Sequence, residues 1–176
     1  MFSGYLFSGH SQNFWVNLLG FNLIWSLCIF LGNDALIIVV ILLLLHFCFH
    51  IQPVVEIQVV LVTGLMGYCI DCVLTILGVF RFENTLGITP LWLLLLWIGF
   101  CATLRQSLSF FNGKTYIAPI AGAIGGCFAY MAAANFNAVE LTQSWLVSAV
   151  LIALIWAFLF PLLLWMSKSI EAYLCN

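Results

Sequence analysis

Charged residues are scarce in this sequence. Only 6% of its 176 residues are Asp, Glu, Lys or Arg, while 65% are hydrophobic. A soluble domain carries about 25% charged residues, so this chain has too few of them to cover a water-exposed surface, and we expect lipid to be its solvent. The net charge is −2. Since the chain has no basic patch, we do not expect it to bind nucleic acid.

Targeting and cross-linking signals are lacking as well. The first nine residues, MFSGYLFSG, contain no Lys or Arg, whereas a secretory signal begins with a positively charged region. We therefore expect the first apolar segment to be retained. Six of the seven cysteines lie in apolar segments, where a disulfide framework is not expected.

One cysteine pair, Cys69 and Cys72, stands in the motif CIDC with Asp71 between the two thiols. Redox work requires a stabilised thiolate, beside a cation or at a helix N-terminus, and this apolar segment supplies neither. A zinc site would need further Cys or His ligands, and only His46 is available, at a different depth. We therefore expect no metal site and no cofactor.

Long apolar segments, in contrast, are abundant. A spanning helix needs about 20 mostly apolar residues, and the apolar runs are continuous rather than alternating, which favours helices over a β-barrel. We predict an all-α polytopic membrane bundle, a single integral membrane domain over residues 1–176 with about six transmembrane helices. The predicted spans are 13–31, 35–51, 57–80, 88–111, 115–136 and 143–167.

The few cations suggest an orientation for these spans. An even number of spans places both termini on one side, together with Lys114, Lys168 and the nearby Arg105, whereas Arg81 lies on the other side. Cytoplasmic loops of membrane proteins carry an excess of Lys and Arg. We therefore expect both termini to be cytoplasmic.

Two charged residues, Asp71 and Arg105, fall inside predicted spans. An ionisable group at membrane depth costs roughly 2.5–3.5 kcal/mol on insertion scales, so each is a candidate site residue. At 1.5 Å per residue, Asp71 lies about 21 Å and Arg105 about 9 Å from the inner ends of their spans, too far apart for a direct ion pair. The alternatives to a site role are a protonated or hydrogen-bonded structural carboxyl for Asp71 and an interfacial anchor for Arg105.

Other polar side chains could join these two in a cavity. His46 lies late in the second span and could transfer protons, because its unperturbed pKa is near neutral. It could equally form a hydrogen bond between helices. Asn22 lies deep enough to face a cavity, although amides also hold helices together in membranes. Ser107 adds a donor beside Arg105, but no GxSxG motif surrounds it.

The fifth span contains the small-residue motif GxxxG, formed by Gly122 and Gly126. Small residues let helix backbones approach closely. We interpret these glycines as a helix-packing surface, either inside the monomer or as the seam of a homo-oligomer through span five.

The segments PLWLLLLWIGFCATLRQSLSFF and IAGAIGGCFAYMAAANFNAV, with the first span NFWVNLLGFNLIW, resemble an uncharacterised family of small bacterial inner-membrane proteins, domain-of-unknown-function family 2878. The further matching positions are His46, Asp71, Pro90, Leu91, Trp92, Ser107 and Leu108. The resemblance covers nearly the whole chain and implies a bacterial inner membrane. It also implies a loose link to lipid metabolism or envelope stress, since members tend to be encoded beside lipid-modifying enzymes, but no catalytic mechanism. Arg105 and Cys72 match no feature of the family.

Three functions agree with these observations. The first is the handling or transport of a small molecule or a membrane lipid through a polar cavity formed by Asn22, His46, Asp71, Arg105 and Ser107. The second is an intramembrane lipid-modifying enzyme with His46 and Asp71 as acid and base, which must then lie within about 3 Å of each other. The third is a non-catalytic accessory subunit of a membrane complex. We favour the first, because the short loops leave no room for a soluble catalytic domain.

Overall fold

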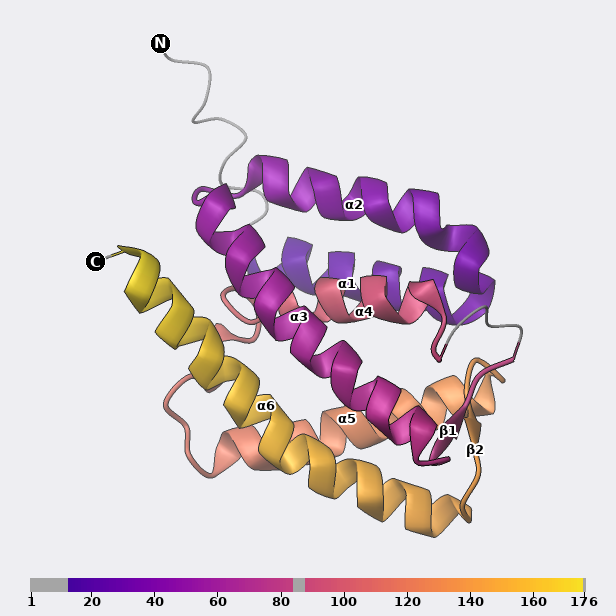
Figure 1. Cartoon of the computed structure of the whole chain (residues 1–176). Coiled ribbons are helices and arrows are strands. Elements are labelled where there is room, and N and C mark those ends of the chain that lie inside the picture. The colour runs from indigo at the N-terminus through magenta and orange to yellow at the C-terminus, as the bar shows by residue number, and fades with distance from the viewer. Residues whose placement is uncertain (1–12, 84–87, 176) are drawn as a thin grey trace.

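The computed structural model describes residues 13–83 and 88–175, and these residues are largely helical (Figure 1). Two short 3₁₀ helices, Gly32–Ala35 and Ser109–Phe111, and two short strands accompany the α-helices. The predicted all-α class is confirmed. The α-helices are α1 (Phe14–Leu31), α2 (Leu36–Phe49), α3 (Pro53–Ile76), α4 (Leu91–Cys101), α5 (Ile117–Asn135) and α6 (Trp145–Cys175).

The helices form two groups joined by α3. Helices α1, α2 and α4 pack together on one side, α5 packs along α6 on the other, and α3 contacts α4 as well as α6 (Figure 1). At one end of the bundle, β1 (Phe80–Arg81) pairs antiparallel with β2 (Glu140–Leu141). This strand pair joins the loop after α3 to the loop before α6 at that end.

The structure does not match the expected count of six spanning helices. Four segments of the described residues are long and apolar enough to cross a membrane: 14–49, α3, α5 and α6. The first of these contains both α1 and α2, which the 3₁₀ helix between them folds back on each other (Figure 1). With 14 and 11 residues, α2 and α4 measure about 21 and 17 Å, less than the ~30 Å hydrocarbon core.

The predicted fourth span, 88–111, is wrong in its second half. Helix α4 ends at Cys101, and tight turns follow, in which Leu104 N–H donates to the Cys101 carbonyl. The Asn17 side chain of α1 holds these turns: its Nδ2 donates to the Ala102 carbonyl, and its Oδ1 accepts from the Ser107 N–H. Irregular backbone inside a membrane protein requires such internal partners.

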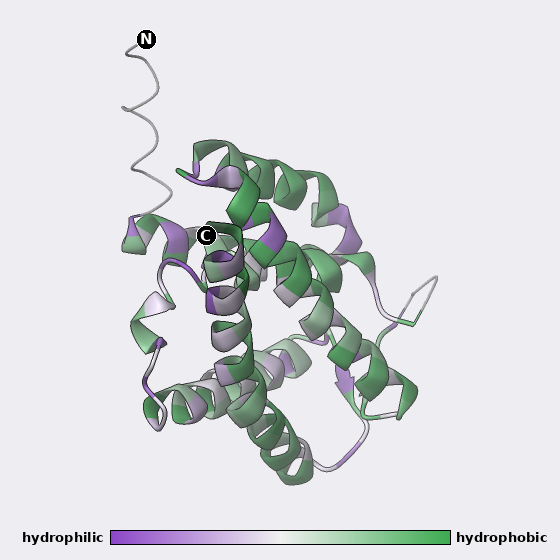
Figure 2. Ribbon diagram, turned by 60° about the vertical axis from the view of Figure 1, so that its left-hand side comes forward, coloured by the Kyte–Doolittle hydropathy of each residue, from purple (hydrophilic) through white to green (hydrophobic). Residues whose placement is uncertain are grey.

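The outer surface of the bundle is apolar. Ile37, Phe128 and Phe158 expose 76%, 73% and 77% of their surface, and hydrophobic residues run along the helices while hydrophilic ones gather towards their ends and in loops (Figure 2). Exposed apolar faces of this extent on long helices are compatible with a multipass membrane protein.

The two glycines of the GxxxG motif lie against α6. A Cβ on Gly126 would meet Trp156 Cγ at 2.1 Å, and one on Gly122 would meet the Trp156 carbonyl at 2.5 Å. These glycines therefore allow α5 and α6 to approach closely within one chain. Both glycines therefore pack within the monomer, against α6.

Candidate functional site

A buried carboxylate, Glu56, is the centre of the largest polar cluster in the described residues. Its side chain is 0% exposed. Arg105 Nη1 donates to its Oε2 at 2.7 Å, His46 Nε2 lies 3.0 Å from its Oε1, and His50 Nε2 lies 3.4 Å from its Oε2. We call this group, together with the two further Arg105 partners Gln52 and Glu171, the Glu56 cluster.

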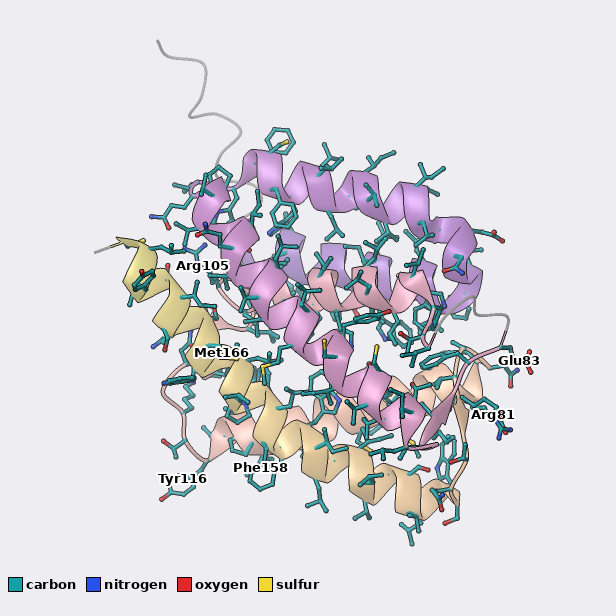
Figure 3. The ribbon with its side chains drawn as sticks, in the orientation of Figure 1. Arg81, Glu83, Arg105, Tyr116, Phe158 and Met166 are labelled. Carbon is teal, nitrogen blue, oxygen red and sulfur yellow. The ribbon has the colours of Figure 1, made fainter. Side chains whose placement is uncertain are left out.

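Arg105 connects this cluster to the end of α6. Its Nη2 donates to Gln52 Oε1 at 2.8 Å and to Glu171 Oε1 at 2.6 Å. In Figure 3, Arg105 lies near the start of α3 and the C-terminal end of α6, at the end of the bundle opposite Arg81 and Glu83. One guanidinium thus bridges two carboxylates from different helices.

Local sequence explains how α2 and α3 present their parts of the cluster. His46 lies in the last turn of α2, and His50, four residues later, caps the C-terminus of that helix, so the two side chains lie on the same side of the helix end. Helix α3 starts at Pro53, and proline is well suited to a first helical position because it lacks an N–H. Glu56 therefore falls in the first turn, where the partial positive charge of the helix end favours an anion.

Two groups of the cluster outside the spanning segments have shifted pKa values. Burial lowers the pKa of His50, and although Glu56 opposes this effect, Arg105 and His46 add to it. Burial also acts to lower the pKa of Arg105, but its bonds to Glu171 and Glu56 outweigh burial, so its pKa is raised. Arg105 therefore stays charged, and His50 favours the neutral form.

One buried donor of the cluster has no partner. Arg105 Nε is buried and makes no hydrogen bond within the described residues. The whole Arg105 side chain is 8% exposed. Buried donors are normally satisfied. The cluster therefore keeps one unused hydrogen-bond donor.

An apolar groove adjoins the Glu56 cluster. It has a volume of about 190 Å³ and lies between α1, α2 and α4. The lining residues are Val16, Asn17, Gly20, Phe21 and Ile24 of α1, Leu42, Leu43, Leu45, His46 and Phe49 of α2, and Gly99 and Ala102. His46 is part of the lining, together with Asn17. The rim is open, because Val16 and Leu45 are each 47% exposed and Phe49 is 38% exposed.

A second polar cluster surrounds Asp71 towards the other end of α3. Asp71 is 2% exposed, and its Oδ2 accepts from Trp97 Nε1 at 2.7 Å and from the Tyr130 hydroxyl at 2.5 Å. Trp97 stacks on Trp156 with ring centroids 5.4 Å apart. The void beside Asp71 measures only about 10 Å³, roughly enough for a single water. We call Asp71, Trp97 and Tyr130 the Asp71 cluster.

The structure does not bring the five expected cavity residues together. His46 and Arg105 meet at Glu56, whereas Asp71 lies in its own cluster. Asn22 is exposed on α1 and donates to the Leu18 carbonyl of its own helix. Ser107 is buried, and its hydroxyl donates to Asn17 Oδ1 at 2.6 Å.

The hypothesis of an acid–base pair formed by His46 and Asp71 has no geometric support. His46 contacts Glu56, and Asp71 follows Glu56 by 15 residues on the same helix, about 22 Å along its axis. The two side chains are therefore far beyond the ~3 Å that proton transfer requires.

The cysteine pair has ordinary surroundings. Cys69 is exposed, and Cys72 Sγ lies 3.3 Å from Thr89 Oγ1. Within residues 13–83 and 88–175, no group of three or more His, Cys, Asp or Glu side chains is arranged to hold a metal ion.

Sequence reasoning missed Glu56, which the predicted spans 35–51 and 57–80 leave in the loop between them. A signal was present, because Pro53 is a favoured first helical residue and would place Glu56 inside the helix. It also missed Asn17 as the side chain that holds the turns after α4. Two of the three groups that Asn17 contacts across the bundle, the Ala102 carbonyl and the Ser107 N–H, are backbone, which has no sequence signature.

Comparisons with known proteins identify the family. The family model described as "Protein of unknown function (DUF2878)" matches residues 14–162. No curated protein and no solved structure matches the chain.

Proposed function

Because this chain belongs to the DUF2878 family of unknown function, we propose a function from the site itself: the protein binds a membrane lipid in the groove between α1, α2 and α4. The acyl chain lies in the groove, and the head group lies at its polar end, beside the Glu56 cluster. The observation that carries this proposal is an open apolar groove that adjoins a buried charge cluster.

The size and lining of the groove suit an acyl chain. A dry apolar cavity of about 150 Å³ accepts benzene, and the groove is larger, at about 190 Å³. From Val16 to Ile24 it follows α1 for about 12 Å. An elongated apolar ligand therefore fits it better than a compact polar one.

The groove is accessible from the side of the bundle. The residues of its rim are apolar and exposed, and they belong to the segment 14–49, which is long and apolar enough to span a membrane. A lipid could therefore enter laterally, without passing through water. The hydrogen-bonding side chains of the lining, Asn17 and His46, lie in the first turn of α1 and the last turn of α2, so the ligand has one polar end.

A glycine in the groove permits a direct test. Gly20 lines the groove, and a Cβ there would meet nothing within 4 Å, so Gly20→Phe fills the groove without a clash at Cβ. The matched control is Gly125→Phe on α5, where a Cβ also meets nothing within 4 Å. Each protein is purified in detergent, and the retained lipid is extracted and quantified by mass spectrometry.

The proposal predicts that wild type and Gly125→Phe retain a stoichiometric lipid and that Gly20→Phe loses most of it. Equal retention by Gly20→Phe would show that the lipid is bound elsewhere. A wild-type protein without bound lipid, in both detergent and nanodiscs, would also overturn the proposal.

For the location we propose the bacterial inner membrane, with both termini cytoplasmic. Among the cations of the described residues, Arg105 is buried in ion pairs and Arg81 contacts Glu140. The remaining two, Lys114 and Lys168, lie in the loop before α5 and in the last turns of α6, both at the end that holds Arg105. Reporter proteins fused after residue 176 test this orientation. Activity of a reporter that functions only outside the cytoplasm would show that the orientation is the opposite one.

A further inference from the structure

We propose that His46 selects the head group of the bound lipid, and that this head group is a hydroxyl, an uncharged hydrogen-bond donor. This inference rests on the proposed function, because it specifies which lipid the groove accepts. It is carried by the position of His46, which contacts Glu56 on one side and lines the groove on the other.

The contact with Glu56 determines which nitrogen of His46 is free. Arg105 holds Glu56 in an ion pair at 2.7 Å, so the Glu56 carboxylate can only accept hydrogen bonds. His46 Nε2, 3.0 Å from Glu56 Oε1, must therefore carry the hydrogen. In a neutral imidazole, Nδ1 then has the lone pair and acts as an acceptor.

Within the described residues, His46 Nδ1 has no hydrogen-bond partner, because the contact with Glu56 is the ring's only hydrogen bond there. The His46 side chain is 13% exposed. Because His46 lines the groove, a bound ligand that donates can satisfy this acceptor, and a hydroxyl donates without adding charge.

The charges of the cluster argue against an anionic head group. The Glu56 cluster contains two carboxylates, Glu56 and Glu171, and one guanidinium, Arg105, so these three groups together carry one net negative charge. A carboxylate or phosphate head group would be repelled, since like charges in a partly buried site interact strongly. A fatty alcohol or a monoacylglycerol carries no charge and is not repelled.

The test is a competition experiment in nanodiscs. A long-chain alcohol with a photoreactive diazirine on its chain is cross-linked to the protein, and the labelled peptides are identified by mass spectrometry. Decanol, decyl methyl ether, decanoate and decylamine compete for the site. The ether has the same chain as decanol but no donor, and decanoate is used at a pH where it is ionised.

We expect the label on peptides of α1 and α2, and decanol should displace it about five- to tenfold better than the ether, the effect of one hydrogen bond. His46→Phe should remove this preference. His46→Gln should retain it, because the amide can donate to Glu56 and accept from the ligand at the same time.

Three results would overturn the inference. Equal displacement by decanol and ether, a preference for decanoate or decylamine, or an unchanged preference in His46→Phe would each show that His46 does not select a hydroxyl. In all of these the groove would still be labelled. Failure of the proposed function is a different result: label outside α1 and α2, or label that Gly20→Phe does not reduce.

Discussion

Glu56 and Asp71 lie on the same helix, 15 residues apart, and both are almost completely buried, with 0% and 2% exposure, yet their partners differ in kind. Glu56 is held by a guanidinium and two imidazoles, and its cluster reaches solvent through Glu171, whose side chain is 41% exposed. Asp71 is held by two neutral donors, an indole N–H and a phenol, and is enclosed by aromatic rings.

The difference separates two uses of a buried carboxylate. Around Asp71 both donors are paired and the adjoining void is minimal, which is the pattern of a contact that holds α3, α4 and α5 together. The Glu56 cluster keeps an unpaired Arg105 Nε and adjoins a groove. We therefore place ligand binding at Glu56 and a structural role at Asp71, and the following predictions test this division.

The largest effect is expected from Arg105→Met. Removing the guanidinium leaves Glu56 buried without its cation, which typically costs about 3–5 kcal/mol of unfolding free energy. Unfolding by SDS in mixed micelles, followed by tryptophan fluorescence, measures this cost. The double variant Arg105→Met with Glu56→Leu should recover part of it, because no buried charge remains; no recovery would argue against the ion pair as the cause.

Removal of the Asp71 carboxylate should have the next largest effect. Asp71→Leu leaves the Trp97 N–H and the Tyr130 hydroxyl without an acceptor, at roughly 2–4 kcal/mol for the two donors together. Asp71→Asn keeps an acceptor oxygen and should cost less than about 1 kcal/mol. The same SDS titration compares them. If Asp71→Asn abolished lipid retention while the fold stayed intact, the structural role of Asp71 would be wrong.

A smaller effect should follow from Gly67→Ala, which acts on the Asp71 cluster through packing alone. A Cβ at Gly67 would meet Trp97 Cε3 at 2.2 Å, so the indole must move, and overpacking of this kind costs about 1–3 kcal/mol. Gly125→Ala is the control, since its Cβ meets nothing within 4 Å. Equal stability of the two variants would show that Trp97 is free to shift.

The smallest effect should be a pH dependence from His50. Burial lowers the pKa of His50 in the folded protein. The Gln52 N–H donates a hydrogen bond to His50 Nδ1, and only the neutral ring can accept this hydrogen bond. Below about pH 6.5, the ordinary histidine value, the unfolded chain binds a proton that the folded chain does not, so stability falls as the pH falls. Thermal unfolding from pH 8 to pH 5.5 should show a steeper loss for wild type than for His50→Gln. Parallel curves would contradict the shifted pKa.

Much of the fold could be predicted from the sequence, but not the break in the fourth span. Between Leu91 and Leu104 only Thr103 is polar, and no proline follows Pro90 within 88–111, so composition predicts one long helix. Helix α4 nevertheless ends at Cys101 because Asn17 of α1 satisfies the backbone of the following turns. That contact joins residues 85 to 90 positions apart, and local pattern carries no information on it.

The candidate site could be predicted only in part. His46, Asp71 and Arg105 stand out in the sequence because polar side chains in an apolar segment are costly. Their grouping was not accessible: Asp71 was expected to share a cavity with His46, yet its partners are Trp97 and Tyr130. Indole and phenol groups are common in membrane helices, so nothing in the sequence marks these two as donors to a carboxylate.

The sequence by itself determined that this protein is an all-α chain solvated by lipid, because both properties follow from sums over many residues, the scarcity of charge and the length of the apolar segments. The tertiary structure alone decided which of the few polar side chains meet. Arg105 reaches Glu56 across 49 positions and Glu171 across 66. Such contacts depend on how each helix is rotated and where it ends, and neither is determined by local sequence.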